Sequence, residues 1–441
     1  MNHFAAVRSE AFKIASDSTT KSLANRVCLL FDLQGRIRIL AELGDEHDPK
    51  AFEQQIASQI SAIAGAFWAA EIWFDRPSSH PISSKAAPSE KALFEAAWRE
   101  ARAEPSGQAF SFVLDRRFSK ESWFDTASSA PWPLNPKTPP IISFYSFKGG
   151  VGRTPALASI AIQCARAGKR VLLLDFDLEA PGLGSVFPPP GGQLEVGLVD
   201  YLLERPVVGA AFNVNEILYV FDDKKVVSTG EIRVVPAGQV DLSYLEKLSR
   251  LDYHRMAQAA DPQATPPLHQ LLKELRLVLA PDLILIDSRA GLHDLGGLAL
   301  SALAHSHVLF GLDSEQSWAG LRIAISHLGR ARILAKEIQR DCLIVQSQVR
   351  PQEGRSESEQ RFRRKSYEVF SADYYDEPSN VNAEWPVPDE MAEDEPHFPS
   401  YLVHDSRVMG YSTIDTVADY LCEGDFRKFA EKLLSKVSLK L

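Results

Sequence analysis

A glycine-rich segment carries the strongest chemical signal in this sequence. Residues 147–154 read FKGGVGRT and stand between an apolar run, residues 141–146, and a helical run, residues 156–167. A glycine-rich turn between a buried strand and a helix aims several backbone N–H groups and the positive end of the helix dipole at one point. Proteins hold polyphosphates in this way, so the segment predicts a phosphate-binding loop.

Two positions depart from the common phosphate-loop pattern G-x-x-x-x-G-K-[ST]. Phe147 stands at the first glycine position and Arg153 at the lysine position. Lysine is a compact point charge, whereas arginine carries a planar fork that needs more room and different angles. Arginine pairs well with phosphate oxygens, so nucleotide binding is still expected. Hydrolysis depends on finer positioning, so slow turnover is expected.

Three aspartates at the ends of apolar runs supply the acids that phosphoryl transfer needs. Asp175 and Asp177 follow residues 170–174, and Asp287 ends residues 283–287. Charge on the transferring phosphoryl group must be neutralised while an attacking water is held in line. A charged strand end without chemistry is the alternative interpretation of Asp175 and Asp177.

The order of these motifs resembles a known family. The letters KGGVG, led by Lys148, resemble the deviant Walker A motif of the ParA/MinD group, within the SIMIBI class of P-loop NTPases. The resemblance continues in LLLDFDLEAPGLG at residues 172–184 and LILIDSRAGL at residues 283–292, and covers residues 141–441. The arginine variant is similar to the KGGVGR-type subgroup, often found in bacterial multidomain or conflict-related proteins. Residues 1–128 resemble no family that we can name.

The resemblance implies ATP and Mg²⁺ as cofactors and assigns roles to individual residues. It makes Lys148 the signature lysine that reaches a partner subunit's nucleotide, and Asp177 the acid that positions water. It places Thr154, Asp287 and Asp177 around the metal, with Asp175 in a supporting role, and makes Lys148, Asp177 and Arg153 the catalytic set. The expected nucleotide contacts are Lys148, Gly149, Gly150, Val151, Gly152, Arg153, Thr154 and Pro155.

Length, charge and cysteine usage limit the class of protein. At 441 residues the chain exceeds one compact domain, and 45% apolar and 24% charged residues are ordinary for a folded protein. A net charge of −10 argues against electrostatic binding of nucleic acid or anionic membranes over the whole chain. Four cysteines, Cys28, Cys164, Cys342 and Cys422, lie far apart and predict buried thiols rather than disulfides or a zinc site. Because no apolar run is long enough to span a membrane, a cytoplasmic location is expected.

The chain divides at a proline-rich stretch. Residues 129–140 are expected to be a linker between an α+β domain at residues 1–128, which is expected to bind a partner, and an α/β domain at residues 141–441. Residues 371–400 contain nine Asp or Glu, no Lys or Arg, and five Pro, which predicts an acidic, mobile excursion.

Periodicity predicts the main elements of both domains. In the first domain, a hairpin is expected from residues 27–31 and 37–43, helices over 51–73 and 90–103, and a strand over 109–114. In the second, continuous Leu, Ile and Val runs predict strands buried on both faces of a mostly parallel sheet flanked by helices. These runs are residues 141–146, 170–175, 232–236, 283–287, 307–312 and 342–347.

Two further features have both a binding and a structural interpretation. Residues 425–441 form a basic amphipathic helix, which fits either membrane targeting or packing on the sheet, and packing is favoured. The basic cluster of Arg361, Arg363, Arg364 and Lys365 fits either DNA contact or a solvated helix face, and the solvated face is favoured.

These observations lead to two functional hypotheses. The first is an ATP-binding, slowly hydrolysing switch that forms a homodimer around the nucleotides and controls a partner protein, in a bacterial conflict or defence system. The second is a nucleotide-bound sensor or scaffold that does not turn over, with Arg153 as the cause.

Overall fold

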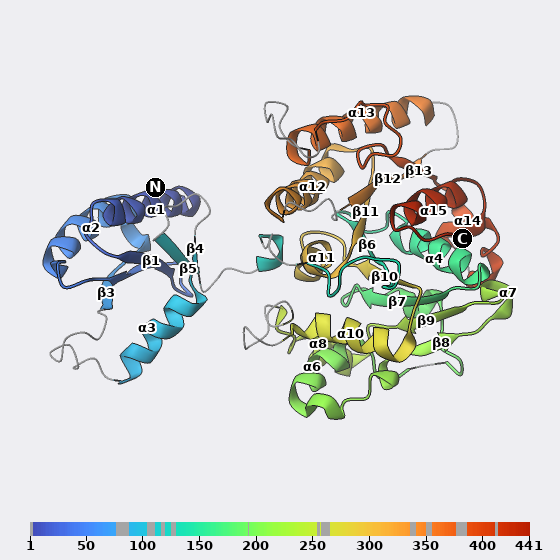
Figure 1. Cartoon of the computed structure of the whole chain (residues 1–441), viewed down its shortest axis with the longest axis horizontal. Helices are drawn as coiled ribbons and strands as arrows, with labels where there is room; N and C mark the ends of the chain where they lie inside the picture. Colours follow the sequence, from blue (N-terminus) through green and yellow to red (C-terminus); the bar gives the residue numbers. More distant parts are fainter. Residues whose placement is uncertain are drawn as a thin grey trace. The chain divides into compact units, whose positions relative to one another are not determined.

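The chain forms two compact units, Met1–Ser119 and Lys120–Leu441, in this computed structural model (Figure 1). The residues described are 3–75, 88–103, 111–115, 120–124, 129–192, 194–253, 256, 265–335, 341–349, 355–375, 386–410 and 413–441. The second unit starts earlier than the sequence predicts, at Lys120, because residues 120–123 contact helix α11 (Asp294–Leu298).

Part of the predicted linker is packed on the second unit. The Trp132 side chain is 7% exposed, donates from Nε1 to the Pro139 carbonyl at 2.9 Å and stacks under the guanidinium of Arg276. His305 Nε2 donates to the Trp132 carbonyl at 2.8 Å. Residues 129–140, predicted to be a linker, thus include a tryptophan that packs on the second unit.

The first unit is a five-stranded sheet in the order β3-β2-β1-β5-β4. Helices α1 and α2 pack on one face and α3 on the other, around separate apolar clusters. Its elements are α1 (Phe4–Thr20), β1 (Arg26–Phe31), β2 (Ile37–Glu42), α2 (Pro49–Ala64), β3 (Trp68–Asp75), α3 (Pro88–Glu100), β4 (Arg102–Ala103) and β5 (Ser111–Asp115).

The predicted hairpin is confirmed, since β1 and β2 pair antiparallel. The predicted helix over residues 51–73 is wrong at its end. The chain leaves the helix at Gly65, which has a φ of 53°, and continues as strand β3, because glycine adopts this left-handed conformation readily.

The second unit contains an eight-stranded sheet in the order β13-β12-β11-β6-β10-β7-β9-β8. All neighbouring pairs are parallel except β8 with β9, so the predicted mostly parallel α/β fold is confirmed. The six predicted strands are all present, and the two edge strands are short. The bounds are β6 (Ile141–Ser146), β7 (Arg170–Phe176), β8 (Tyr219–Phe221), β9 (Glu231–Val235), β10 (Leu283–Ser288), β11 (Ser306–Gly311), β12 (Asp341–Val349) and β13 (Ser400–Val403).

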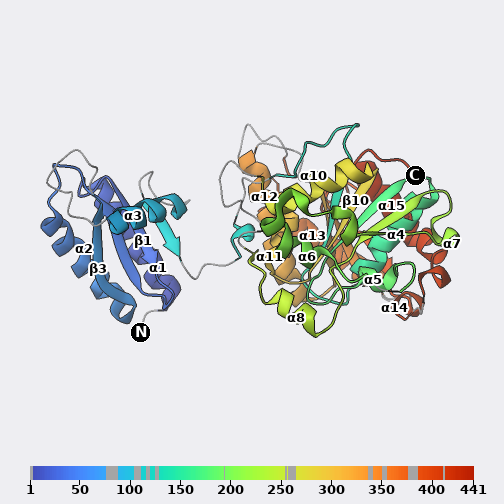
Figure 2. The same ribbon diagram turned by 90° about the horizontal axis from the view of Figure 1, so that it is seen from below.

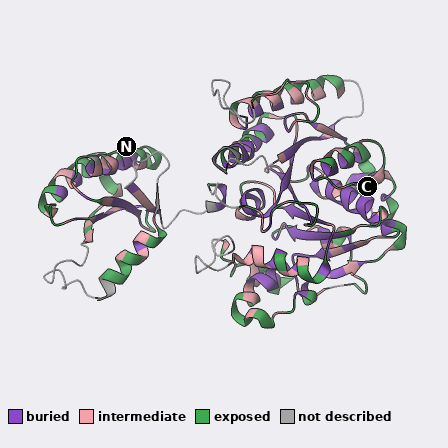
Figure 3. Cartoon of the chain, viewed as in Figure 1, coloured by how far each residue is buried: buried purple, intermediate pink, exposed green. Residues whose placement is uncertain are grey.

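Helices cover both faces of this sheet, as Figure 2 shows from below. One face packs on α4 (Arg153–Arg166), α7 (Lys224–Val227) and α15 (Gly424–Lys436). The other face packs on α6 (Leu198–Val208), α8 (Leu242–Leu248), α10 (Pro267–Leu279), α11, α12 (Glu315–Ala335) and α13 (Arg355–Asp373). The central strands β6, β10 and β11 are buried at every residue (Figure 3), as expected of a sheet covered on both faces.

For residues 425–441 and the basic cluster, the contacts favour the structural interpretation over the binding one. The apolar stripe of α15 lies in the core, with Phe429 and Leu433 at most 1% exposed. In the basic cluster, Arg361 pairs with Asp313 at 2.8 Å, and Lys365 pairs with Glu368. Among the described helices, none combines the length and the apolarity that crossing a membrane requires.

The predicted acidic excursion is partly an ordered segment. Residues 376–385 lie outside the described residues, but residues 386–400 pack against α13 and α15. His397 is fully buried, its carbonyl accepts from Ser366, and its ring meets the Tyr375 hydroxyl at 2.8 Å. Lys432 donates to the Phe398 carbonyl at 2.9 Å. Residues 386–400 are thus held against α13 and α15 by these contacts, despite the acidic composition of the segment.

Candidate functional site

The glycine-rich loop joins the end of β6 to the start of α4, as predicted. Gly150 and Gly152 have φ values of 70° and 81°, which glycine adopts without the steric cost that a Cβ atom brings. Gly152 is the residue at which α4 begins, so the free N–H groups of the first helical turn face the loop. The Ser146 hydroxyl donates to the Lys148 carbonyl at 2.8 Å and supports the turn from below.

A cavity of about 610 Å³ lies over this loop. Besides loop residues, it is lined by Asp177 and by Ala290, from the segments that follow β7 and β10. Of the eight expected nucleotide contacts, Lys148 does not line the cavity. The seven that do are Gly149, Gly150, Val151, Gly152, Arg153, Thr154 and Pro155.

Arg153 is buried and faces two carboxylates. Its Nε lies 2.5 Å from Asp287 Oδ1, its Nη2 lies 3.1 Å from Asp177 Oδ2, and its Nη1 donates to the Ser146 hydroxyl at 3.0 Å. The side chain is 9% exposed. Burial alone would lower the pKa of Arg153, but the two carboxylates raise it above its usual value. Arg153 therefore neutralises the acids at the carboxyl ends of β7 and β10.

Thr154 and Asp287 meet as a magnesium site would require. The Thr154 hydroxyl donates to Asp287 Oδ2 at 2.6 Å, and Asp287 is 2% exposed. Asp177 Oδ1 is buried and accepts no hydrogen bond from any residue described in this structure. In the described residues, no group of three His, Cys, Asp or Glu side chains could hold a metal ion. Hydroxyl and carboxylate oxygens suit Mg²⁺, which would complete its shell with phosphate and water oxygens.

Asp175 holds the turn that follows β7. Its carboxylate accepts N–H groups of Asp177, Gly182 and Leu183 at 2.9 to 3.1 Å, and the residue is fully buried. Burial, together with repulsion from Asp287, raises the pKa of Asp175 to about 7, although the three N–H groups oppose that shift. These contacts fit the expected supporting role, since Asp175 positions Asp177 through the backbone.

The phenylalanine at the first glycine position has a structural partner. A Cβ atom on Gly320, within α12, would lie 1.9 Å from the ring of Phe147. The ring therefore sits directly on the backbone of α12, where only glycine leaves room. This contact explains how the loop accommodates Phe147 and fixes the loop against a long helix.

A second charged network, missed in the sequence, adjoins the first. Arg289 Nη1 lies 2.6 Å from Glu179 Oε2 and 3.8 Å from Asp177 Oδ1, and His293 Nε2 lies 2.9 Å from Glu179 Oε1. Burial would raise the pKa of Glu179, but the hydrogen bonds from His293 and Arg289 hold it below its usual value. These contacts join the segment that follows β7, which carries Asp177 and Glu179, to the segment that follows β10. Glu179 and Arg289 lie inside the motifs LLLDFDLEAPGLG and LILIDSRAGL, but neither motif indicates that they pair.

Gln348 is also absent from the sequence-based site. It has a φ of 54°, and its side-chain amide donates to the Gly150 carbonyl at 2.5 Å. The end of β12 thus holds the glycine loop by one side chain. No local pattern predicts this contact, because it joins residues 198 positions apart.

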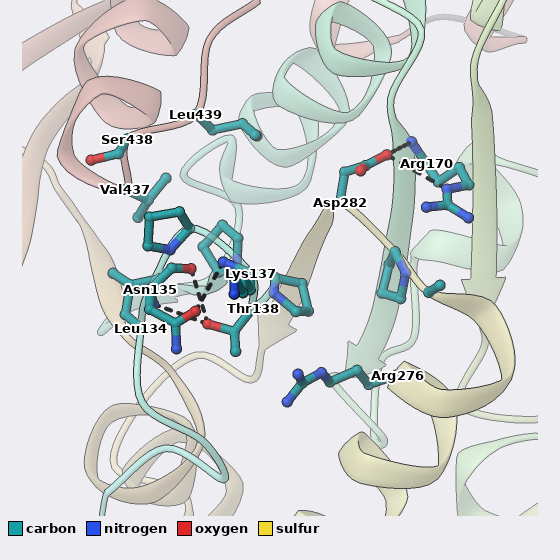
Figure 4. A pocket seen from close by; sticks show the side chains of 15 residues that line it. Leu134, Asn135, Lys137, Thr138, Arg170, Arg276, Asp282, Val437, Ser438 and Leu439 are labelled. Atoms are coloured by element: carbon teal, nitrogen blue, oxygen red, sulfur yellow. Dashed lines mark hydrogen bonds and ion pairs between the residues drawn. The ribbon is translucent and has the colours of Figure 1, made fainter.

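A second cavity, of about 650 Å³, lies at the other edge of the sheet (Figure 4). It is lined by residues 134–140 and by side chains at the amino-terminal starts of β7 and β10. Arg170 pairs with Asp282 at 3.6 Å there, and Arg276 stacks on Trp132. It is lined by none of the predicted site residues.

No protein-family model matches this chain. A curated protein described as an uncharacterized ATP-binding protein, from Methanocaldococcus jannaschii, is 47% identical over 47 residues, which are 11% of this chain and 18% of that protein. The chain thus spans less than a fifth of the length of that relative.

Solved structures to which the chain is similar include proteins of the ParA/MinD group. The septum site-determining protein MinD from Pyrococcus horikoshii, complexed with Mg-ADP, is 18% identical over 69% of this chain and all of that chain, with a TM-score of 0.41. pNOB8 ParA bound to nonspecific DNA is 20% identical over 68% of this chain and 99% of its own, with a TM-score of 0.44. Because these TM-scores are below 0.5, the fold assignment rests on the strand order and loop of this chain itself.

Proposed function

We propose that this protein is a nucleotide-dependent switch that binds ATP with Mg²⁺ at the glycine-rich loop and hydrolyses it slowly. The observation that carries the proposal is the cavity of about 610 Å³ at the start of α4, which Thr154 and Asp177 line, with Asp287 bonded to the Thr154 hydroxyl. Seven of the expected contact residues line this cavity, and free N–H groups of a helix start face it. One similar protein is described as ATP-binding and another as complexed with Mg-ADP, which agrees with this choice of ligand.

In the proposed reaction, each residue of the site has a distinct task. Bound Mg²⁺ would supply positive charge to the phosphates, with Thr154 and Asp287 as its protein ligands. Asp177 would hold the attacking water through its buried, unbonded oxygen. Arg153 would keep the two acids ionised and correctly spaced.

The resting position of Arg153 supports slow rather than fast turnover. Its guanidinium already makes three contacts with Asp287, Asp177 and Ser146. A Mg²⁺-nucleotide must share or displace those contacts before the site is ready for hydrolysis, because Asp287 would serve both cations. Such a rearrangement adds to the barrier of each turnover.

We further propose that this switch acts as a homodimer in the cytoplasm, which the family resemblance supports. Lys148 lies on the loop but does not line its own cavity, as a residue that acts on a partner subunit's nucleotide should. Three buried cysteines without disulfides agree with a reducing compartment. Control of a partner protein through the first unit, and a role in conflict or defence, stay predictions.

The second candidate is a nucleotide-bound sensor that does not turn over. The same three contacts of Arg153 favour it, since they could hold the acids away from catalysis permanently. Steady-state and single-turnover hydrolysis of ATP by the purified full chain, with mass spectrometry of any retained nucleotide, separates the two. Slow but repeated turnover supports the switch, whereas retained ATP without product after many hours supports the sensor.

A further inference from the structure

We propose that the segment of residues 120–123, termed the connector, is a latch that reports the nucleotide state of the site to the first unit. This inference rests on the proposed nucleotide switch and adds the route by which the switch is read. The connector begins the second unit, so the chain that leaves the first unit enters the second one here. The connector therefore lies at the point where the two units join along the chain.

Four hydrogen bonds fasten the connector to the start of α11. The Lys120 backbone N–H and its Nζ both donate to the Asp294 carboxylate, each at 2.9 Å. The Ser122 hydroxyl donates to the Asp294 carbonyl at 3.0 Å, and Trp123 Nε1 donates to the His293 carbonyl at 2.9 Å. The partners are consecutive residues, so the connector holds a single short stretch of chain.

The fit of the connector is close as well as polar. A Cβ atom on Gly297 would lie 2.4 Å from the Ser122 hydroxyl oxygen and 2.8 Å from Trp123 Nε1. The Trp123 side chain is 5% exposed and packs edge-on against Tyr145 of β6 and His327 of α12. The connector thus packs closely between α11 and the core of the second unit.

The same stretch of chain is tied to the nucleotide site from its other side. His293, whose carbonyl accepts from Trp123, contacts Glu179 through its ring at 2.9 Å. Glu179 pairs with Arg289, and Arg289 faces Asp177, which pairs in turn with Arg153. A chain of ion pairs and hydrogen bonds therefore runs from Arg153, which lines the cavity, to the residue that holds the connector.

A bound nucleotide disturbs this chain at its first member. Triphosphate oxygens compete with Asp177 and Asp287 for Arg153, and a magnesium ion competes with Arg153 for Asp287. Each of these exchanges of partner changes the electrostatic environment of Arg289 and Glu179. The position of His293 is expected to change with it. Because this chain of contacts ends at His293, whose carbonyl accepts from Trp123, we expect nucleotide binding to release the connector.

The latch has a matched pair of test variants. Trp123→Phe removes the Nε1 donor to His293 and keeps an aromatic ring on Tyr145. Trp132→Phe removes an equivalent donor from a tryptophan that is 7% exposed, but this donor bonds to the Pro139 carbonyl at 2.9 Å and not to the start of α11. Neither tryptophan lines the nucleotide cavity.

The first experiment measures hydrogen exchange of the nucleotide-free full chain by mass spectrometry. Trp123→Phe is expected to raise exchange in peptides that cover residues 288–297 by up to about fivefold, the effect of one neutral hydrogen bond on an equilibrium constant. Trp132→Phe should leave these peptides unchanged. Equal exchange in the parent protein and in Trp123→Phe would overturn the latch, whether or not nucleotide binds.

The second experiment adds a non-hydrolysable ATP analogue with Mg²⁺ to the parent protein. Exchange in peptides covering residues 120–124 should rise, and Trp123→Phe should bind the analogue up to about fivefold more tightly, because coupling between two sites is reciprocal. Unchanged or slower exchange at the connector, with calorimetry showing the analogue bound, refutes the latch. Failure of the analogue to bind at all would instead refute the proposed function, and the first experiment still decides on the latch.

Discussion

Arg153 occupies a place where most phosphate loops carry lysine, and its contacts differ in kind from those of a lysine. Three of its N–H groups reach three acceptors on different elements, Ser146, Asp177 and Asp287. A single ammonium group cannot lie at hydrogen-bond distance from all three in the same geometry. The loop and its acids are therefore shaped around a guanidinium group.

Arg153→Lys tests that conclusion through the rate of ATP hydrolysis. Although the change restores the common motif, the turnover number for ATP should rise less than tenfold, since the shorter ammonium cannot bridge both carboxylates. Steady-state hydrolysis with a matched Arg170→Lys control at the other sheet edge measures this. A gain of tenfold or more, about 1.4 kcal/mol off the barrier, would show that arginine is a crippling substitution in an ordinary loop.

Asp175 gives the site a predictable response to pH. Its pKa of about 7 in the folded protein is higher than in an unfolded chain, so the native state retains a proton that the unfolded state has lost. Between about pH 4 and pH 7 this group therefore lowers the free energy of unfolding as pH rises, by at most about 1.4 kcal/mol per pH unit, and adds no further slope above that range.

Asp175→Asn should remove that contribution. Urea unfolding of the parent and the variant from pH 4.5 to 8 should show a difference in free energy that changes up to about pH 7 and then levels. Asp223→Asn, which alters the carboxylate that caps α7, serves as the control. A difference that is constant across the whole range would contradict the raised pKa.

At the scale of elements, the glycine loop is held by its neighbours as much as by its own sequence. Phe147 rests on Gly320 of α12, and Gln348 at the end of β12 bonds the Gly150 carbonyl. Both contacts come from elements far along the chain. The position of the loop therefore depends on how α12 and β12 pack.

Gly320→Ala should displace Phe147 and with it the loop. Because the added methyl group meets the ring at 1.9 Å, the free energy of unfolding should fall by about 1 to 3 kcal/mol, the usual cost of overpacking. Binding of the ATP analogue should weaken as well. The double variant Phe147→Ala with Gly320→Ala should recover part of both losses in thermal unfolding and calorimetry. Additive losses in the double variant would argue that the two residues do not act as a pair.

The sequence predicted the elements that local pattern determines. The continuous apolar runs identified six strands of the parallel sheet, and the glycine pattern located the start of α4. It did not indicate features that long-range contacts decide. Gly65 ends α2 and β3 follows, Trp132 packs part of the predicted linker on the second unit, and His397 anchors an acidic segment.

The candidate site shows the same division. The motif order selected Arg153, Thr154, Asp177 and Asp287, which the fold brings within hydrogen-bond reach of one another. It did not indicate that Arg153 turns toward the acids, since that depends on the spacing between β7 and β10. Nor could it identify Glu179 and Arg289 as partners, because ion pairs between loops leave no periodic signal.

At the scale of the whole molecule, the account requires nucleotide-dependent association through Lys148. Lys148→Ala should bind the ATP analogue with Mg²⁺ at near-normal affinity as a monomer but should not form the analogue-dependent dimer. Light scattering of the parent and the variant, with and without the analogue, measures the mass. Lys137→Ala, at a lysine of the other cavity, is the control. A parent protein whose mass is unchanged by the analogue would contradict the dimer.

The central claim is that the cavity over the glycine-rich loop binds a magnesium nucleotide through Thr154 and its neighbours. Isothermal titration calorimetry of a non-hydrolysable ATP analogue into the full chain, with Mg²⁺ present, tests it most directly. The account predicts one site per chain and an affinity at least tenfold weaker in Thr154→Ala, whose hydroxyl is the proposed metal ligand. No heat of binding in the parent protein, or the same affinity in both proteins, would contradict it.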